Sequence, residues 1–492
     1  MDPIKVADNI SPFVIYIICS LPLVYFAIRH GTTFLLNIAL RLTGQKKTTD
    51  PRGCRRLGLP PGRSNLHDEF DPKYQEGVPS DYDDHHDDND DVLPNWRIKA
   101  LFAYPIKSCA GVEFDVADVV GTGLAYDRQF CFAEYVTPGE GKLDGKNSPR
   151  WEFRTMRNVR FSKLALIRPE IWVPDPTSPD YSPDLEEVKS QGVLVIYYPR
   201  TVSFCRGRFL SSLVTKLGMA LGLCAREASF QVPLHPSQGH DYPSVPVQLW
   251  KDFPLACDYG RHIPTELREF LSAGTDDAPP LTLFRADPAH YRAIFRCAPR
   301  KSELGFQPHT GFADAYPLHM LNLASVQDVA RRCSYAIPRL SARRFRANII
   351  IQGPSAYEED SWKRIRVGGG RTRKNRNQKS ETRDQRPSNK KGDKEEDGDS
   401  DGVEIYTVCR TVRCRLPNVD PDTGIRHPTE PDRTLKSFRC IDAGDPKNAC
   451  LGMQLVPAVE EFTIRVGERI SVLETGEHFY IKMLAPGDPA VG

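Results

Sequence analysis

The chain has 492 residues, of which 40% are hydrophobic and 26% charged, so it is long enough for two or three packed domains. Lys and Arg total 66 against 64 Asp and Glu, and this formal charge of +2 gives no reason to expect a nucleic-acid partner. The 13 cysteines are irregularly spaced without a CxxC pair, which argues against a disulfide scaffold or a zinc ribbon and favours reduced thiols in a cytosol-facing protein.

The N-terminal region is predicted to anchor the chain in a membrane. Residues 10–28 carry no charge, and their length is about what a helix needs to cross the hydrocarbon core. The preceding residues hold one Lys against two Asp, and no cleavage pattern follows, so we expect a retained anchor within residues 1–43. The next apolar stretch, 33–42, fits an interfacial helix, a continuation of the anchor or a short buried helix. Positive charge collects between Arg29 and Arg52, which places the rest of the chain on the cytosolic side.

Two polar stretches have the composition of disordered segments. Residues 44–94 are rich in Pro, Gly, Asp and Lys, and we expect a flexible tether. Within it, DYDDHHDDNDD at 81–91 resembles a metal cluster, but a solvated acidic spacer is the better interpretation because nothing indicates a rigid scaffold. Residues 368–402 are basic first and acidic last, contain no aliphatic or aromatic residue to bury, and are predicted to form a disordered surface insertion.

The remaining sequence predicts a mixed α+β fold with a β-rich core. Strand-like segments occur between residues 97 and 260 and fit an antiparallel barrel or sandwich. Apolar residues at helical spacing then predict helices over 263–274 and 321–333. Strands resume in the later segments RFRANIIIQG, EIYTVCRTVRCRL and ERISVLE.

Two early blocks carry candidate anion ligands. In YPIKSCAG a strand ends at Pro105 and presents Lys107 and Ser108, which suit a phosphate or a pterin carbonyl. In GLAYDRQFCF, Asp127 and Arg128 stand at a strand start, where Arg128 fits either a phosphate or a neighbouring carboxylate. An exposed lysine at a strand end would explain the first block equally simply.

A third block, RFRANIII, is predicted to be a strand. Its alternation would place Arg344, Arg346 and Asn348 on one face, either exposed to solvent or directed at a polar ligand. The following EEDSW, at 358–362, supplies carboxylates that could orient these arginines.

The fourth block centres on Cys414, which is flanked by Arg413 and Arg415, with Arg410 close by. Local positive charge favours thiolate over thiol. Such a thiolate could ligate a high-valent transition metal, act as a nucleophile or carry a persulfide, and a purely structural cysteine is the alternative. The VDPDTG that follows is predicted to be a tight turn.

Taken in order, YPIKSCAG, GLAYDR, RTMRN, FADAYPLHMLNLASV, RFRANIII, AYEEDSW, RCRLPNVDPDTG and LKSFR resemble the MOSC family over residues 97–473. The nearest subgroup is that of the mitochondrial amidoxime-reducing components. The resemblance implies a β-barrel-rich fold, with an N-terminal β-barrel domain at 97–285, a MOSC domain at 286–475 and a tail at 476–492. It also implies a molybdenum cofactor, in which molybdenum is chelated by a pterin dithiolene and by one protein cysteine.

The resemblance assigns roles residue by residue. Cys414 matches the metal ligand, and Arg439 of LKSFR matches a position near the metal and is expected to take part in catalysis. The positions that match cofactor-binding residues are Lys107, Ser108, Arg128, Asp314, Ala315, Arg346 and Asn348.

The chain departs from the family pattern at two positions of the expected site. Thr411 stands where the subgroup often has a second cysteine, and Cys409 is displaced from that position by two residues. Ala315 replaces a common hydroxyl residue.

The leading hypothesis is a reductase of N-hydroxylated substrates such as amidoximes. No GxGxxG follows a strand, so we see no intrinsic NAD or flavin site and expect electrons from a partner, which in this family is cytochrome b5 with its reductase. The alternatives are a sulfur carrier with a persulfide on Cys414 and a non-catalytic, membrane-tethered binding protein. The family favours the mitochondrial outer membrane, with the endoplasmic reticulum as the rival location.

Overall fold

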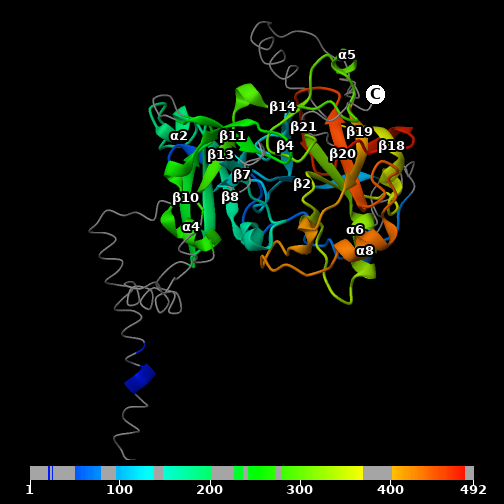
Figure 1. Ribbon diagram of the computed structural model, residues 1–492, viewed down its shortest axis with the longest axis horizontal. Coiled ribbons are helices and arrows are strands. Elements are labelled where there is room, and N and C mark those ends of the chain that lie inside the picture. The colour runs from blue at the N-terminus through cyan, green and yellow to red at the C-terminus, as the bar shows by residue number, and fades with distance from the viewer. Residues whose placement is uncertain are drawn as a thin grey trace, which may run out of the picture.

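The computed structural model describes residues 20–22, 25, 50–78, 96–137, 148–200, 226–236, 242–272, 279–368 and 402–482. These residues form a mixed α+β fold dominated by β-structure, as the sequence predicted. In Figure 1 the cyan and green strands of the N-terminal part lie beside the yellow-to-red strands of the C-terminal part.

A closed five-stranded barrel confirms the predicted N-terminal barrel. Its strands are β6 (Phe130–Val136), β7 (Arg150–Phe153), β11 (Ser244–Gln248), β12 (Leu255–Asp258) and β13 (Leu281–Ala286). The barrel closes because β7 pairs antiparallel with β6 and parallel with β11. Small and aromatic side chains fill its interior, among them Ala133, Val247 and Phe284.

An eight-stranded sheet organises the C-terminal part. Its order is β22 (Ile470–Thr475), β18 (Trp362–Val367), β19 (Val403–Val412), β20 (Cys450–Pro457), β16 (Leu318–Asn322), β17 (Ile349–Gln352), β2 (Arg97–Ala103) and β3 (Val112–Phe114). Since β2 and β3 come from the N-terminal part, the predicted division at residue 286 does not separate the two sheets.

Three smaller sheets complete the strand inventory. One has the order β1 (Cys54–Arg56), β8 (Arg168–Pro174), β9 (Val193–Pro199), β10 (Glu227–Pro233). Another has the order β21 (Phe462–Arg465), β4 (Val116–Val120), β5 (Gly123–Leu124), and the last pairs β14 (Arg292–Ala293) with β15 (His309–Thr310).

The helices are short. The α-helices are α2 (Glu186–Lys189), α4 (Thr265–Ser272), α5 (Lys301–Leu304), α6 (Leu323–Arg332) and α8 (Asp432–Phe438). The 3-10 helices are η2 (Pro72–Tyr74), η3 (Val159–Leu166), η4 (Gly260–His262), η5 (Pro288–His290), η6 (Ala342–Phe345), η7 (Glu358–Ser361) and η8 (Leu416–Asn418).

Both predicted helices are confirmed, as α4 and α6. Helix α6 begins after Asn322, whose Oδ1 accepts the N–H of Ala324 at 3.1 Å and so caps the first turn. Leu323, Val326 and Val329 repeat at helical spacing and are buried against the large sheet.

The predicted strand through RFRAN is wrong. Ser341 Oγ accepts the N–H of Arg343 at 3.2 Å, so the chain turns into η6 instead of extending. Arg346 ends this turn with a left-handed φ of 56°, and the strand β17 begins only at Ile349.

The predicted tether is also wrong for its described part, because residues 50–78 are folded against the body. Leu66 and Tyr74 are buried in an apolar cluster with α6. Glu69 is buried and accepts the N–H of Ala342 at 2.8 Å, and Gln327 donates to the Glu69 carbonyl at 2.7 Å. The acidic run at 81–91 lies outside the described residues.

Most of the predicted anchor also lies outside the described residues; only residues 20–22 and 25 of the 10–28 segment are described, as helix. Among the residues that were placed, no helix is long and apolar enough to cross a membrane. Ten cysteines are described, and all are free thiols, as the sequence predicted.

Residues 369–401 of the predicted insertion are not described, but their flanking strands are. Val367 of β18 pairs with Val403 of β19, so both ends of the segment meet at the start of β19. Cys414 follows the other end of this 10-residue strand, about 30 Å away. The insertion therefore begins and ends far from Cys414.

Glu468, in the turn between β21 and β22, is expected to make stability depend on pH. Among the described residues neither of its carboxyl oxygens has a hydrogen-bond partner, and burial raises its pKa from 4.5 to about 7, with Arg465 opposing the shift. Because the pKa of Glu468 is higher in the folded than in the unfolded state, protonation of Glu468 favours folding. This contribution to the free energy of unfolding is complete below about pH 4.5 and is lost as the pH rises through about 7.

We therefore expect Glu468→Gln to be more stable than the wild type at about pH 8, with the difference shrinking toward about pH 5. Thermal unfolding at both pH values measures this. Glu474→Gln is the control, since the Glu474 side chain is 57% exposed. A stability difference that does not change with pH would contradict the assignment.

Candidate functional site

A cavity of about 160 Å³ opens between the barrel and the large sheet, and we call it the Cys414 cavity. Its walls come from the loop after β2, the turn before β6, the loop between β15 and β16, the residues before β17 and the end of β19. The structure brings eight of the nine predicted site residues into its lining: Lys107, Ser108, Arg128, Asp314, Ala315, Arg346, Asn348 and Cys414.

Cys414 is half-buried and lies just beyond the end of β19. The register between β19 and β20 shifts twice, between Thr407 and Cys409 and between Arg410 and Val412. Bulges of this kind redirect side chains, and they are common beside active sites. They explain why five consecutive residues, 410–414, all line the cavity, whereas a regular strand would present only alternate ones.

Lys107 and Asp314 form an ion pair at the cavity wall. The Lys107 ammonium is buried and donates to Asp314 Oδ1 at 2.6 Å and to the Phe312 carbonyl at 2.8 Å. Burial lowers the pKa of Lys107, although Asp314 opposes the change. Desolvation in the cavity would raise the pKa of Asp314, but the Lys107 ammonium, the Trp250 N–H and the Arg128 charge together hold that pKa well below its usual range. Asp314 therefore stays ionised at neutral pH.

Arg128 and Asn348 form a hydrogen-bonded pair in the wall of the cavity. Arg128 donates to the carboxylate of its neighbour Asp127, to Asn348 Oδ1 at 3.2 Å and to the Arg346 carbonyl at 2.9 Å. Asn348 is fully buried and donates in turn to the Phe102 carbonyl at 3.1 Å. The Arg128 backbone has a φ of 48°, which is uncommon for a non-glycine residue, and is held by bonds of its N–H to the Tyr104 carbonyl at 2.8 Å and of its carbonyl to the Phe312 N–H at 2.9 Å.

Ser108 and Ala315 contribute less polar capacity. Ser108 is buried, and its Oγ accepts the N–H of Met156 at 3.3 Å. Ala315 is half-buried beside Tyr316 and offers only a methyl group, so the hydroxyl expected from the family pattern is missing at this position.

Arg346 and Arg413 give the cavity uncompensated positive charge. Arg346 donates to the Cys109 carbonyl at 2.5 Å and lies over the Tyr104 ring at 4.1 Å. Arg413 donates to the Phe345 carbonyl at 2.8 Å and lies over the Phe345 ring at 5.1 Å. Neither makes an ion pair with a carboxylate anywhere in the described part of the chain, and burial lowers the pKa of each to about 10.

Three buried polar atoms of the lining have no hydrogen-bond partner among the described residues: Arg346 Nη2, Arg410 Nε and Thr411 Oγ1. Buried polar groups are nearly always hydrogen-bonded, so orphaned donors beside uncompensated arginines indicate a bound anionic ligand. The donor set fits a pterin cofactor that carries a phosphate, and the Cys414 thiol is a soft ligand suited to its metal.

Sequence reasoning missed other lining residues. Arg413 was noted only as a charge that favours the thiolate, and His319 was quoted within a motif without a role. His319 is buried with a pKa well below its usual value because of its desolvation and of Arg413, which lies 3.4 Å from its Nε2. No sequence motif pointed to Trp250. The closing of the barrel brings it to the cavity, where its indole N–H donates to Asp314 at 3.0 Å.

Arg344 does not share a face with Arg346. It is buried and donates to Asp420 Oδ2 at 2.5 Å and to the Pro417 carbonyl at 3.2 Å. Asp420 opens the predicted VDPDTG turn, where its Oδ1 accepts two backbone N–H groups. Arg344 therefore holds the loop that follows Cys414.

Arg439, expected to act in catalysis, does not line the cavity. Its guanidinium donates to Asp360 at 2.8 and 2.6 Å and to the Cys450 carbonyl at 2.9 Å. The EEDSW carboxylates also differ from expectation, because Asp360 pairs with Arg439, and Glu359 accepts from Asn322 and Ser325. Neither carboxylate pairs with Arg344 or Arg346.

Family comparison agrees with this geometry. Residues 95–181 match the MOSC N-terminal beta barrel domain, and residues 307–386 match the MOSC domain. The chain therefore contains both a MOSC N-terminal beta barrel domain and a MOSC domain, and both matched ranges contribute residues to the lining of the Cys414 cavity.

Among individual relatives, mitochondrial amidoxime-reducing component 1 of Mus musculus is 32% identical over 168 residues, which cover 33% of this chain and 38% of the relative. Mitochondrial amidoxime reducing component 2 of Rattus norvegicus is 30% identical over 131 residues, 27% of this chain and 28% of the relative. A molybdenum cofactor sulfurase of Chaetomium globosum is 25% identical over 301 residues, 55% of this chain and 33% of the relative. The matched part thus spans less than two fifths of each of these relatives.

Proposed function

We propose that this protein is a molybdenum-cofactor-dependent reductase of N-hydroxylated compounds such as amidoximes. The observation that carries the proposal is the Cys414 cavity, in which a half-buried thiol shares the lining with Arg346 and Arg413. Neither arginine has a carboxylate partner in the described chain, and Nη2 of Arg346 has no hydrogen-bond partner there. The names of the relatives suggest the reaction class, and the match to the MOSC domain suggests which cofactor is bound.

Each group of residues has a distinct part in this proposal. Cys414 would ligate the metal, while Arg346 and Arg413 would bind the phosphate or pterin oxygens, whose negative charge compensates theirs. Arg128 and Asn348 would orient the Arg346 backbone beside the cofactor. When bound, the cofactor supplies the two electrons that, with two protons, convert an N–OH group into N–H and water.

Asp314 is unsuited to supply those protons at neutral pH. The Lys107 ammonium keeps its pKa well below the usual range, so its carboxylate remains ionised. We infer that Asp314 instead holds Lys107 in place at the cavity wall, 2.6 Å away, while Lys107 presents its charge to the cofactor.

Electrons would come from a partner protein, and a cytochrome b5 type donor with its reductase is the partner suggested by the family resemblance. We also propose attachment to a membrane through residues 10–28 and, from the names of the relatives, a mitochondrial location. An anchor would hold the enzyme near membrane-bound donors and raise their effective concentration.

The test is to purify the full chain from a host that makes the molybdenum cofactor and, as a control, from one that cannot. We expect stoichiometric molybdenum and pterin only in the first preparation, together with benzamidoxime reduction driven by reduced methyl viologen. A metal-free, inactive protein from the competent host would overturn the proposal.

The match to a molybdenum cofactor sulfurase, which covers 55% of this chain, favours a second candidate. In it, Cys414 would carry a persulfide and pass the sulfur on. Mass spectrometry of the Cys414 peptide separates the two functions, because only the carrier would hold one extra sulfur atom after incubation with a desulfurase and cysteine.

Arg346 offers a prediction about cofactor retention. Arg346→Gln removes a cavity cation whose Nη2 is unpaired, so we expect the bound pterin after dialysis to fall at least tenfold. Arg343→Gln is the matched control from the same turn, because Arg343 pairs with Asp422, which is 63% exposed. Equal pterin contents in the two variants would show that Arg346 does not hold the cofactor.

A further inference from the structure

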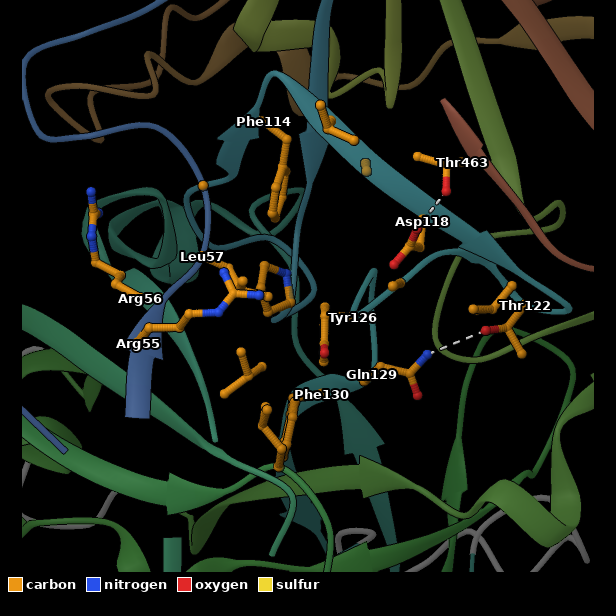
Figure 2. A pocket seen from close by; sticks show the side chains of 18 of the residues that line it. Arg55, Arg56, Leu57, Phe114, Asp118, Thr122, Tyr126, Gln129, Phe130 and Thr463 are labelled. Carbon is orange, nitrogen blue, oxygen red and sulfur yellow. Dashed lines mark hydrogen bonds between the residues drawn. The ribbon is translucent and has the colours of Figure 1, made fainter. Parts of the chain in front are cut away.

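A second and larger cavity, of about 980 Å³, lies where the N-terminal segment meets the barrel and the three-stranded sheet (Figure 2). We call it the Arg285 cavity. None of its lining residues also lines the Cys414 cavity. Its volume is at the upper end of the range for small-molecule sites.

One part of the lining is apolar and aromatic. Figure 2 shows Leu57, Phe114, Tyr126 and Phe130 arranged around the cavity, and they come from three different segments of the chain. Tyr126 holds a left-handed backbone with a φ of 68°. Such conformations persist only where the surrounding structure enforces them, and they gather at ligand sites.

Arg285 places a buried charge in this cavity. It is only 2% exposed, and it donates to the Leu234 carbonyl at 2.5 Å, to the Ala286 carbonyl at 3.0 Å and to His235 Nδ1 at 2.9 Å. These bonds use three of the five guanidinium N–H groups and leave one on Nη1 and one on Nη2. In the described chain no carboxylate pairs with Arg285, and a buried cation without a counter-ion is costly.

His235 adds a second donor. Burial and the Arg285 charge lower its pKa to about 4, so the ring is neutral at physiological pH. Because Nδ1 accepts from Arg285, the ring proton must be on Nε2, which leaves Nε2–H free to donate. The Arg285–His235 pair therefore offers donors only.

A third donor in the lining is Arg55. Arg55 is exposed, points into the cavity in Figure 2 and makes no ion pair within the described residues. The lining also holds two acids: Asp115 accepts from Asn65 at 2.9 Å and pairs with Arg63, and Asp118 accepts at 2.9 Å from the hydroxyl of Thr463, which also lines the cavity.

We propose that the Arg285 cavity binds an organic anion with an apolar body. Its carboxylate or phosphate head would lie at Arg285, His235 and Arg55, and its apolar body would pack against Phe114, Tyr126 and Phe130. This site is independent of the proposed reductase activity, since it shares no residue with the Cys414 cavity.

The test is calorimetric titration of the full chain with dodecanoate, dodecyl phosphate, dodecanol and inorganic phosphate, each below its aggregation concentration. We expect saturable binding of at least one anionic amphiphile, at least tenfold tighter than that of dodecanol or of inorganic phosphate. The order of dodecanoate and dodecyl phosphate identifies the head group. Equal affinity for dodecanol and both anions, or no saturable binding, would overturn the proposal.

Two variants locate the bound anion. Arg285→Met should weaken binding about tenfold or more, and Arg55→Ala roughly two- to fivefold. Arg55 is exposed and unpaired, so its variant keeps the test valid if the core variant fails to fold. Arg331→Ala is the control, because Arg331 is 65% exposed and pairs with Asp328 on α6. If Arg55→Ala binds like the control, the anion lies elsewhere and the proposal is wrong.

Discussion

Replacing Cys414 with serine is expected to abolish benzamidoxime reduction while leaving much of the pterin bound. Turnover and pterin retention separate because they depend on different groups of the cavity. The Cys414 thiol is expected to hold the metal, whereas Lys107, Arg346 and Arg413 are expected to bind the anionic part of the cofactor. Replacing a residue that only hydrogen-bonds to a metal ligand typically lowers activity about 10–100-fold. Replacing the ligand itself should lower activity more, on the order of 100-fold or above.

Three measurements check this expectation: turnover per chain, molybdenum content and pterin content of the purified variant. Cys440→Ser is the matched control, since Cys440 is also a half-buried free thiol but lies outside the Cys414 cavity. Turnover that survives in Cys414→Ser would exclude Cys414 as an essential ligand. Loss of both metal and pterin would instead show that the thiol is needed to retain the whole cofactor.

The contrast between these variants follows from how the cavity is assembled. The loop that follows Cys414 is fixed by a turn, in which Arg344 pairs with Asp420, whose carboxylate also accepts the N–H groups of Asp422 and Thr423. The cations are held from other elements, by carbonyls of Cys109 and Phe345. Removing the thiol therefore leaves the cation positions intact.

The sequence could predict most of the site because its residues stand next to recognisable element ends. Lys107 and Ser108 follow β2, Arg128 precedes β6, and Cys414 follows β19. Such positions are where strands deliver side chains to one edge of a sheet. Trp250 could not be predicted in this way, because it reaches Asp314 only through the parallel pairing of β7 and β11 that closes the barrel.

The errors have equally local causes. Alternating residues in RFRAN satisfy a strand pattern, but one hydrogen bond from the N–H of Arg343 to Ser341 Oγ starts a 3-10 turn that the two-residue period cannot reveal. The Pro- and Gly-rich composition of residues 50–78 indicated a tether. Their burial depends on long-range contacts, such as the packing of Leu66 and Tyr74 against α6 and the bond of Glu69 with Ala342, which leave no periodic signal.

Arg439→Ala is expected to destabilise the fold without altering the chemistry of each folded molecule. The Arg439 side chain is 6% exposed and that of Asp360 is 13% exposed, and their two bonds of 2.8 and 2.6 Å satisfy both carboxylate oxygens. Truncating one partner leaves a buried, uncompensated carboxylate, which costs about 3–5 kcal/mol. The guanidinium also lies over the Tyr357 ring at 4.1 Å, so packing is lost as well.

Urea unfolding of Arg439→Ala beside Arg343→Ala measures the effect. Arg343 pairs with Asp422, whose side chain is 63% exposed, so its variant leaves no buried carboxylate and should lose less than about 1 kcal/mol. The double variant Arg439→Met with Asp360→Leu should recover part of the loss, because it removes both charges and keeps the volume. If Arg439→Ala instead keeps its stability and loses turnover per bound molybdenum, the residue acts in catalysis despite its distance from the lining of the cavity.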